Sequence, residues 1–296
     1  MKMGESIERA TDHPLAGRAD GDPTLHIWTK TLAFVSSTLL TLGSSPAMAQ
    51  PESHVQMSAA VDYQGYTPGD SGLLAITFVM DKDWHIYWPG VSDSGFGVEF
   101  DLKYDTDLIT LDDPIWPTPE RYLQPGDILD HIYEGTATVL FPFKVAKDAE
   151  DNQAIDFEID ADFLVCADVC LPGKASASTA SKIVYQSEEK LPTATQSDIQ
   201  AQYDNKPKVY DPDARNVRTQ WIPDMAAIMI QGAEKIEFFP SIECSEIINL
   251  IEDGTTDSDR LLIHFVSSKD KVLSGRLRAT GIYGVVDYDI DIKPPK

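Results

Sequence analysis

Short runs of apolar or alternating residues, separated by Gly, Pro, Asn and Asp, make up most of the chain after residue 54. This pattern is typical of antiparallel β structure, because side chains in a strand point alternately to opposite faces. No strongly periodic helical stretch occurs between residues 55 and 185. The pattern predicts strands over Gly72–Met80, Gly97–Tyr104, Ala137–Val145, Ala154–Val165 and Ala175–Tyr185.

A change of composition divides the chain near its middle. Residues 186–216 are polar, contain prolines and have few β-branched apolar residues, so they predict a linker with one short helix. Strand patterns resume beyond it, in "AAIMIQG", "KIEFFP", "RLLIHFV", "LSGRLRAT" and "VVDYDIDI". We therefore expect an all-β protein with one β domain over residues 50–185 and a smaller β domain over residues 217–296.

The first 49 residues read as a signal peptide with an N-terminal extension. Lys30 is followed by an apolar run over residues 32–42 and by Ala47-Met48-Ala49, a small-residue cleavage pattern, which predicts cleavage after Ala49. The apolar run is shorter than the about 20 residues that a membrane span needs. No second run approaches that length, so we expect an exported protein whose mature chain does not span the membrane.

The charge of the chain limits its partners. It has 24 Lys and Arg residues against 48 Asp and Glu residues, a formal net charge of −24. Such a chain is repelled by nucleic acid and by anionic lipid. We therefore expect no nucleic-acid partner.

The segment with the most reactive side chains is "DFLVCADVCLPGKA", residues 162–175, which contains two of the three cysteines. In a fully extended strand, Cys166 and Cys170 would have Cα atoms about 13 Å apart. A disulfide needs them within about 7 Å, so residues 167–169 must turn if the bond forms. Closing so small a loop stabilises the protein by only about 2 kcal/mol, which makes a redox role plausible for the pair.

The neighbouring charges indicate what kind of redox element the pair would be. Asp160, Asp162 and Asp168 surround it in sequence, and the nearest basic residue is Lys174. Negative charge disfavours a thiolate, so nothing local predicts a strongly activated nucleophile. The interpretation we favour is a dithiol that exchanges with a partner protein carrying the activated thiol.

Other interpretations of the cysteines stay open at the level of sequence. The main alternative is a structural disulfide, since most disulfides of exported proteins are structural. A copper(I) site with His131 or His264 is less favoured because no further cysteine pair or histidine cluster completes the ligands, and two free thiols are disfavoured outside the cytosol. Cys244 is the odd cysteine, and the apolar residues on both sides of it predict a buried, inert thiol rather than an intermolecular contact.

Several aromatic residues precede the cysteines. We interpret Trp84, Tyr87, Trp88 and Trp116 as residues that pack in the core and loops, since exported β-sandwiches bury such rings. His85 would point away from Trp84 in an extended segment, which predicts a surface histidine.

Three segments in order carry a family resemblance: "DWHIYWPGVSDSGFGVEFDL", "PIWPTPERYLQPGDILDHIYEG" and "DFLVCADVCLPGKA". Together they resemble the N-terminal periplasmic domain of the DsbD thiol:disulfide interchange proteins, especially the branch with the copper-sensitivity protein ScsB. The resemblance implies an immunoglobulin-like β-sandwich with a redox-active disulfide, in the periplasm. Its implied partners are a thioredoxin-like or membrane-embedded thiol:disulfide reductase and oxidised periplasmic proteins, and it implies no cofactor and no metal.

The resemblance also assigns roles to individual residues. It implies that Cys170 forms the mixed disulfide with partners and that Cys166 resolves it, as in a protein-disulfide reductase component. It further implies a capping loop at "DHIYEG", with Ile132 or Tyr133 over the disulfide. Full-length relatives continue into a membrane domain and a thioredoxin-like domain, and this sequence reads as a stand-alone relative without them. Where those relatives have "WRNPGDSG", it has "WPGVSDSG".

Overall fold

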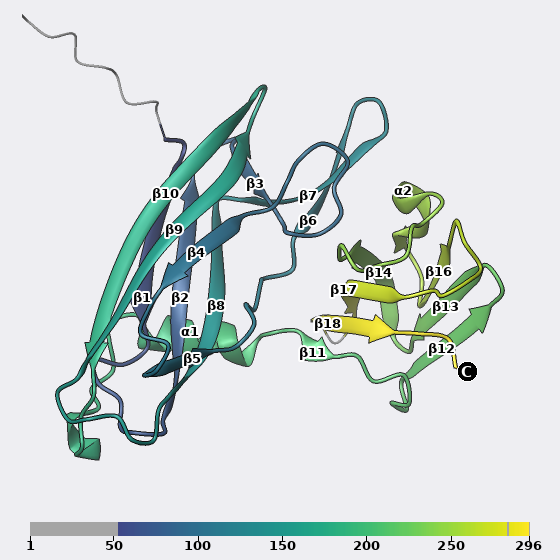
Figure 1. Cartoon of the computed structure of the whole chain (residues 1–296). Helices are drawn as coiled ribbons and strands as arrows, with labels where there is room; N and C mark the ends of the chain where they lie inside the picture. The colour runs from purple at the N-terminus through teal and green to yellow at the C-terminus, as the bar shows by residue number, and fades with distance from the viewer. Residues whose placement is uncertain (1–52, 283, 296) are drawn as a thin grey trace, which may run out of the picture. The chain divides into compact units, whose positions relative to one another are not determined.

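The structure, a computed structural model, describes residues 53–282 and 284–295. The expected signal peptide therefore lies outside the described residues. Most of the regular secondary structure of the described chain is strand, arranged in four sheets (Figure 1). The described residues group as one compact unit, so the proposed division into two β domains stays a prediction.

Two sheets form a sandwich from the first half of the described chain. One has the order β1 (Val55–Val61), β2 (Ser71–Met80), β8 (Thr136–Val145), β5 (Ile109–Leu111). The other has the order β10 (Cys170–Lys182), β9 (Ala154–Cys166), β3 (His85–Tyr87), β7 (Ile128–Glu134), β6 (Glu120–Gln124), and β4 (Glu99–Lys103) also pairs with β9. All of these pairings are antiparallel.

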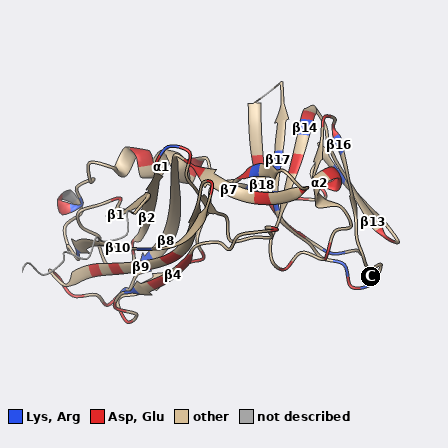
Figure 2. Cartoon of the chain, turned by 90° about the horizontal axis from the view of Figure 1, so that it is seen from above, with Lys and Arg blue, Asp and Glu red and all other residues tan. Residues whose placement is uncertain are grey.

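The sandwich core follows the alternation seen in the sequence. Strand β9 buries Phe157, Ile159 and Phe163 on its inner face, against Phe78 of β2 and Phe141 of β8 in one hydrophobic cluster. Its outer face carries the acidic residues Asp156, Glu158, Asp160 and Asp162. Figure 2 shows acidic residues along β9 and its neighbour β4. The inner face therefore drives folding, and the outer face is charged.

The second half of the described chain forms two further sheets. One has the order β11 (Lys208–Val209), β18 (Gly284–Ile292), β17 (Leu273–Gly281), β14 (Ala233–Pro240), β15 (Thr255–Thr256). The other has the order β12 (Val217–Ile222), β13 (Met225–Ile230), β16 (Arg260–His264). They share a separate hydrophobic cluster that includes Ile228, Phe238, Ile263 and Leu277.

Helices are few and short among the described residues: η1 (Ser187–Glu189), α1 (Gln196–Asp204) and α2 (Leu250–Asp253). The helix α1 lies in the segment where one short helix was expected. No described helix is both long and apolar enough to cross a membrane. All ten strands predicted from sequence coincide with strands of the structure. The sequence pattern did not predict β1, β3, β5, β6, β7, β11, β12 and β15.

Candidate functional site

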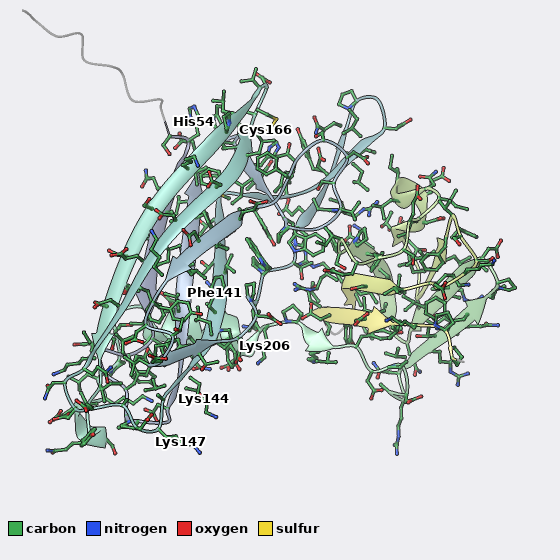
Figure 3. The ribbon with its side chains drawn as sticks, in the orientation of Figure 1. His54, Phe141, Lys144, Lys147, Cys166 and Lys206 are labelled. Atoms are coloured by element: carbon green, nitrogen blue, oxygen red, sulfur yellow. A yellow bond between two sulfur atoms is a disulfide. The ribbon has the colours of Figure 1, made fainter. Side chains whose placement is uncertain are left out.

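Strands β9 and β10 form a hairpin, and the two cysteines lie at its tip (Figure 3). Cys166 ends β9, Cys170 begins β10, and residues 167–169 turn between them. The two residues are register partners with Cα atoms 4.1 Å apart, and their sulfurs are joined in a disulfide. The turn that a bond between them requires is therefore present.

The two sulfurs differ in their access to solvent. Cys166 is 1% exposed, whereas Cys170 is an exposed residue. Its neighbours Val169 and Leu171 are 61% and 39% exposed, so the exposed residue Cys170 lies between two exposed apolar side chains. An incoming thiolate therefore reaches Cys170 more readily than Cys166.

Tyr87 is the residue that sequence reasoning missed. Its hydroxyl donates a hydrogen bond to Cys166 Sγ at 3.2 Å and lies 3.8 Å from Cys170 Sγ. Burial raises the pKa of Tyr87, so the phenol keeps its proton and remains a donor. The sequence did offer one signal for this position, the alternation of side chains along a strand. Ile86 points into the core, so Tyr87 and His85 point to the opposite face of the strand.

The residues expected to form a capping loop belong instead to the strand β7. Ile132 is 1% exposed and shares a small apolar cluster with Tyr87 and Cys166. Tyr133 points to the opposite face, where its hydroxyl donates to the Pro117 carbonyl at 2.7 Å and its ring belongs to the sandwich core. Both residues take an extended form because β7 pairs with β3 and β6, and a capping role for either of them stays a prediction. Of the two residues, Ile132 is the one that packs with Cys166.

His85 is buried rather than on the surface, with 4% of its area exposed. It does point away from the sandwich core, but the outer face of β3 is covered by Tyr122 of β6, whose ring centroid lies 5.2 Å from that of His85. Burial lowers the pKa of His85, and the charge of Asp130 opposes this shift. The imidazole is therefore disposed to be neutral.

Asp130 is a fully buried carboxylate behind the site. It accepts hydrogen bonds from the Ser94 amide at 2.9 Å, the Ser94 hydroxyl at 2.5 Å and the Gln124 side-chain amide at 2.7 Å. These donors satisfy the carboxylate, as a buried charge requires. Ser94 thus ties the loop between β3 and β4 to β7.

The acidic residues near the cysteines are partly neutralised. Asp162 forms an ion pair with Lys174, and Asp160 bonds to Lys103 Nζ at 3.1 Å. Asp168 remains exposed in the turn between the cysteines. The local field is therefore less negative than the sequence alone indicates.

Within the described residues, no group of three or more His, Cys, Asp or Glu side chains is placed to hold a metal ion. The two histidines considered for copper have other contacts: His131 Nδ1 donates to the Val91 carbonyl at 2.6 Å, and His264 Nδ1 lies 3.1 Å from Asp253. Cys244 is partly buried, its thiol faces the Val272 carbonyl at 3.6 Å, and burial raises its pKa to about 11. It therefore has the character of an inert thiol.

Comparisons with known proteins agree with this geometry. A sequence model described as "Thiol:disulfide interchange protein DsbD, N-terminal" matches residues 46–182. The N-terminal periplasmic domain of ScsB from Proteus mirabilis has a similar structure, with a TM-score of 0.50 and 15% identity, over 84% of this chain and 97% of that one. The reduced DsbD N-terminal domain of Neisseria meningitidis is 16% identical over 42% of this chain and 86% of its own, with a TM-score of 0.26. No curated protein matches the chain.

The likeness to ScsB confirms the expected immunoglobulin-like β fold. A disulfide at Cys166 and Cys170 within such a domain fits thiol:disulfide exchange. Residues 53–182 thus form a domain that is similar to the DsbD N-terminal domain, with the cysteine pair at the tip of its longest hairpin.

Proposed function

We propose that the protein is an exported thiol:disulfide exchange module that relays electrons through Cys166 and Cys170. One observation carries this proposal: the disulfide joins an exposed residue, Cys170, to a buried residue, Cys166, whose sulfur accepts a hydrogen bond from Tyr87. Exchange needs one accessible sulfur for the incoming thiolate and one stabilised leaving sulfur. The hairpin tip supplies both.

The exchange runs in two directions. A partner thiolate attacks Cys170 Sγ, the bond between the two sulfurs breaks, and Cys166 leaves as a thiolate that the Tyr87 hydroxyl stabilises. The second thiol of the partner then attacks the mixed disulfide and releases the reduced pair. A reduced Cys170 thiolate attacks the disulfide of an oxidised client in the same way, and Cys166 resolves the product.

A purely structural role for the disulfide has less support. Strands β9 and β10 already pair along 13 residues each, from the cysteines to Ala154 and Lys182. A bond across the tip closes a very small loop, whose contribution in the chain-entropy model is only about 2 kcal/mol. The disulfide therefore adds little to the stability of a hairpin that is already paired along its whole length.

The partners that we propose are proteins. Val169 and Leu171 expose apolar surface on both sides of the accessible sulfur, and such surface suits a protein partner better than a small thiol. We propose a thioredoxin-like or membrane-embedded thiol:disulfide reductase as the electron donor, and oxidised periplasmic proteins as clients. The periplasm is the compartment that the N-terminal signal pattern favours.

Trapping of a mixed disulfide tests the assignment of the two sulfurs. In a Cys244→Ser background, the Cys166→Ser variant should accumulate a mixed disulfide with the oxidised form of a thioredoxin-like donor that keeps only its attacking cysteine, activated as a mixed disulfide with a small thiol, because neither protein then retains a resolving thiol. The Cys170→Ser variant should accumulate none. Equal trapping by both variants, seen by non-reducing electrophoresis and mass, would reject the assignment.

The reduction potential separates exchange from a structural bond. It is obtained by equilibrating the protein with glutathione, followed by thiol alkylation and mass measurement. Catalytic disulfides lie at about −120 to −270 mV, and structural ones lie below about −300 mV. A value in the lower range would favour a non-catalytic binding or copper-handling module instead.

A further inference from the structure

Four residues form a row across the sheet that contains β10, β9, β3 and β7, on the face that points away from the sandwich core. Cys170 pairs with Cys166, Cys166 pairs with His85, and His85 pairs with Glu134, on the strands β10, β9, β3 and β7. Register partners in antiparallel strands point to the same face, with Cβ atoms about 4.5–5.5 Å apart. The row therefore runs from the exposed residue Cys170 to the exposed residue Glu134 through Cys166 and His85.

His85 has an unused nitrogen in the middle of this row. Its Nε2 atom is buried and has no hydrogen-bond partner among the described residues. The ring instead packs against the rings of Tyr87 and Tyr122, with centroids 5.4 Å and 5.2 Å away. Buried polar atoms are rarely left without a partner, so an unpaired nitrogen beside a redox disulfide calls for a role.

The groups around His85 define how its charge responds to reduction. The titratable groups that face it are Tyr87 on its own strand, Tyr122 on β6, Asp130 and Glu134 on β7, and Cys166 on β9. While the disulfide is intact, Cys166 carries no charge and burial favours the neutral imidazole. Reduction places a thiolate on Cys166, and a nearby negative charge favours the imidazolium.

We propose that His85 takes up one proton from solvent when the disulfide is reduced, so that the buried Cys166 thiolate forms beside an imidazolium. This inference rests on the exchange function proposed above. The balance is as follows: the incoming thiolate forms a bond to Cys170 Sγ, the electron pair of the broken bond goes to Cys166 Sγ, and a proton from water binds His85 Nε2. The incoming negative charge is thereby neutralised within the site.

The same row of residues also provides a path by which a proton from solvent can reach His85. Glu134 lies on the side of His85 opposite to Cys166 and is exposed to solvent. A carboxylate at the surface collects protons from water and buffer, and it lies one strand away from the imidazole. His85 thus acts as a positioning residue for charge, and the sulfur chemistry itself remains with the cysteines.

An NMR titration of the histidine ring protons tests the proposal without a protein partner. The ring signals are followed against pH in the oxidised protein and after reduction with a phosphine, and His85 is assigned from its absence in His85→Gln. We expect the His85 titration midpoint to rise by at least one pH unit on reduction. An unchanged midpoint for His85 would overturn the proposal.

Single-cysteine variants assign the effect to one sulfur. In Cys170→Ser, where Cys166 alone remains at the tip, the raised His85 midpoint should persist while Cys166 is ionised. In Cys166→Ser it should return to the value of the oxidised protein. If the His85 midpoint were raised in Cys166→Ser and not in Cys170→Ser, the order of residues in the row would not explain the effect.

The two proposals fail separately. If His85 shifts on phosphine reduction but no mixed disulfide forms with thioredoxin-like donors, the coupling stands and the exchange function falls. If exchange proceeds while the His85 midpoint stays fixed, the function stands and the coupling falls.

Discussion

The hydroxyl of Tyr87 donates a hydrogen bond to the sulfur of Cys166 across 3.2 Å, although 79 positions separate the two residues in the sequence. The contact arises because the short strand β3 pairs with the end of β9. It gives the buried sulfur a donor at the point where negative charge develops during exchange.

Replacement of Tyr87 by Phe removes this donor and keeps the ring. A hydrogen bond to a charged group contributes about 1.5–3 kcal/mol, so exchange through Cys170 should slow by about tenfold or more. In a Cys170→Ser protein, the pKa of Cys166 should rise by about one unit or more, because the thiolate loses its donor. Thiolate absorbance against pH measures this shift.

Tyr133→Phe is the matched control for Tyr87→Phe. It removes a hydroxyl that donates a hydrogen bond to the Pro117 carbonyl. Tyr133 points into the sandwich core, on the face of the sheet opposite to Cys166. It should cost about 1 kcal/mol of unfolding free energy and leave the pKa of Cys166 unchanged. Equal effects of both variants on Cys166 would argue against a direct role for Tyr87.

Truncation of Ile132 tests whether it shields the buried sulfur. Ile132→Ala removes apolar cover from Cys166, so alkylation of Cys166 in the reduced protein should become several-fold faster. The loss of buried volume should also lower the free energy of unfolding by about 2–5 kcal/mol. Quenched alkylation followed by peptide mass gives the rate for each cysteine.

Leu129→Ala provides the comparison for Ile132→Ala. Leu129 is also buried on β7, and its odd spacing from Ile132 places it on the opposite face. It should destabilise the protein similarly while Cys166 remains slow to react. If the two variants accelerate alkylation equally, global opening explains the rate and Ile132 has no shielding role.

Gly173 holds the cysteine hairpin close to the core. It is the register partner of Phe163, and a Cβ atom at Gly173 would lie 2.3 Å from the Phe163 ring. Gly173→Ala should therefore lower the free energy of unfolding by about 1–3 kcal/mol, because Phe163 is buried and has little room to move. Urea unfolding measures the loss.

Ser178→Ala, an exposed change on the same strand, should remain within about 0.5 kcal/mol of the wild type. A Gly173→Ala protein as stable as Ser178→Ala would mean that the hairpin shifts freely at this point. The reduction potential of the pair should then be unaffected as well.

The strands with clear alternation were predictable because the pattern is local. In β9, each inner residue is apolar and each outer residue before Leu164 is polar or charged, except for the Ala at its start, so the face in the core could be read directly. The hairpin tip could also be anticipated, since a bond between Cys166 and Cys170 requires a turn.

The surroundings of the sulfurs could not be read in this way. His85 and Tyr87 lie on a strand of three residues, too short for a periodic signal, and their burial depends on the pairing of β3 with β9 and β7. Ile132 and Tyr133 resembled a loop, and only the pairing partners of β7 show which of them faces the disulfide. The surroundings of the disulfide thus depend on pairing between strands far apart in the sequence, whereas the β fold class can be predicted from local alternation.

The buried ring of His131 makes stability depend on pH. Because a carbonyl only accepts, Nδ1 donates to Val91, and Nε2 is left buried without a partner in the described structure. Burial lowers the pKa of His131 to about 4. The unfolded chain, with a pKa near 6.5, binds the proton more strongly. Stability from this group is therefore complete above about pH 6.5 and is lost as the pH falls towards 4, by about 3 kcal/mol in total.

His131→Phe should flatten this dependence, since it removes the titrating group and keeps a ring in the core. Urea unfolding at intervals between pH 4 and 7 gives the slope, which should decrease by about one proton. Leu129→Ala, equally buried and without a titrating group, should lower stability by a similar amount at every pH and keep the slope of the wild type. If His131→Phe also keeps that slope, another group sets the acid sensitivity, and the buried neutral imidazole is not its cause.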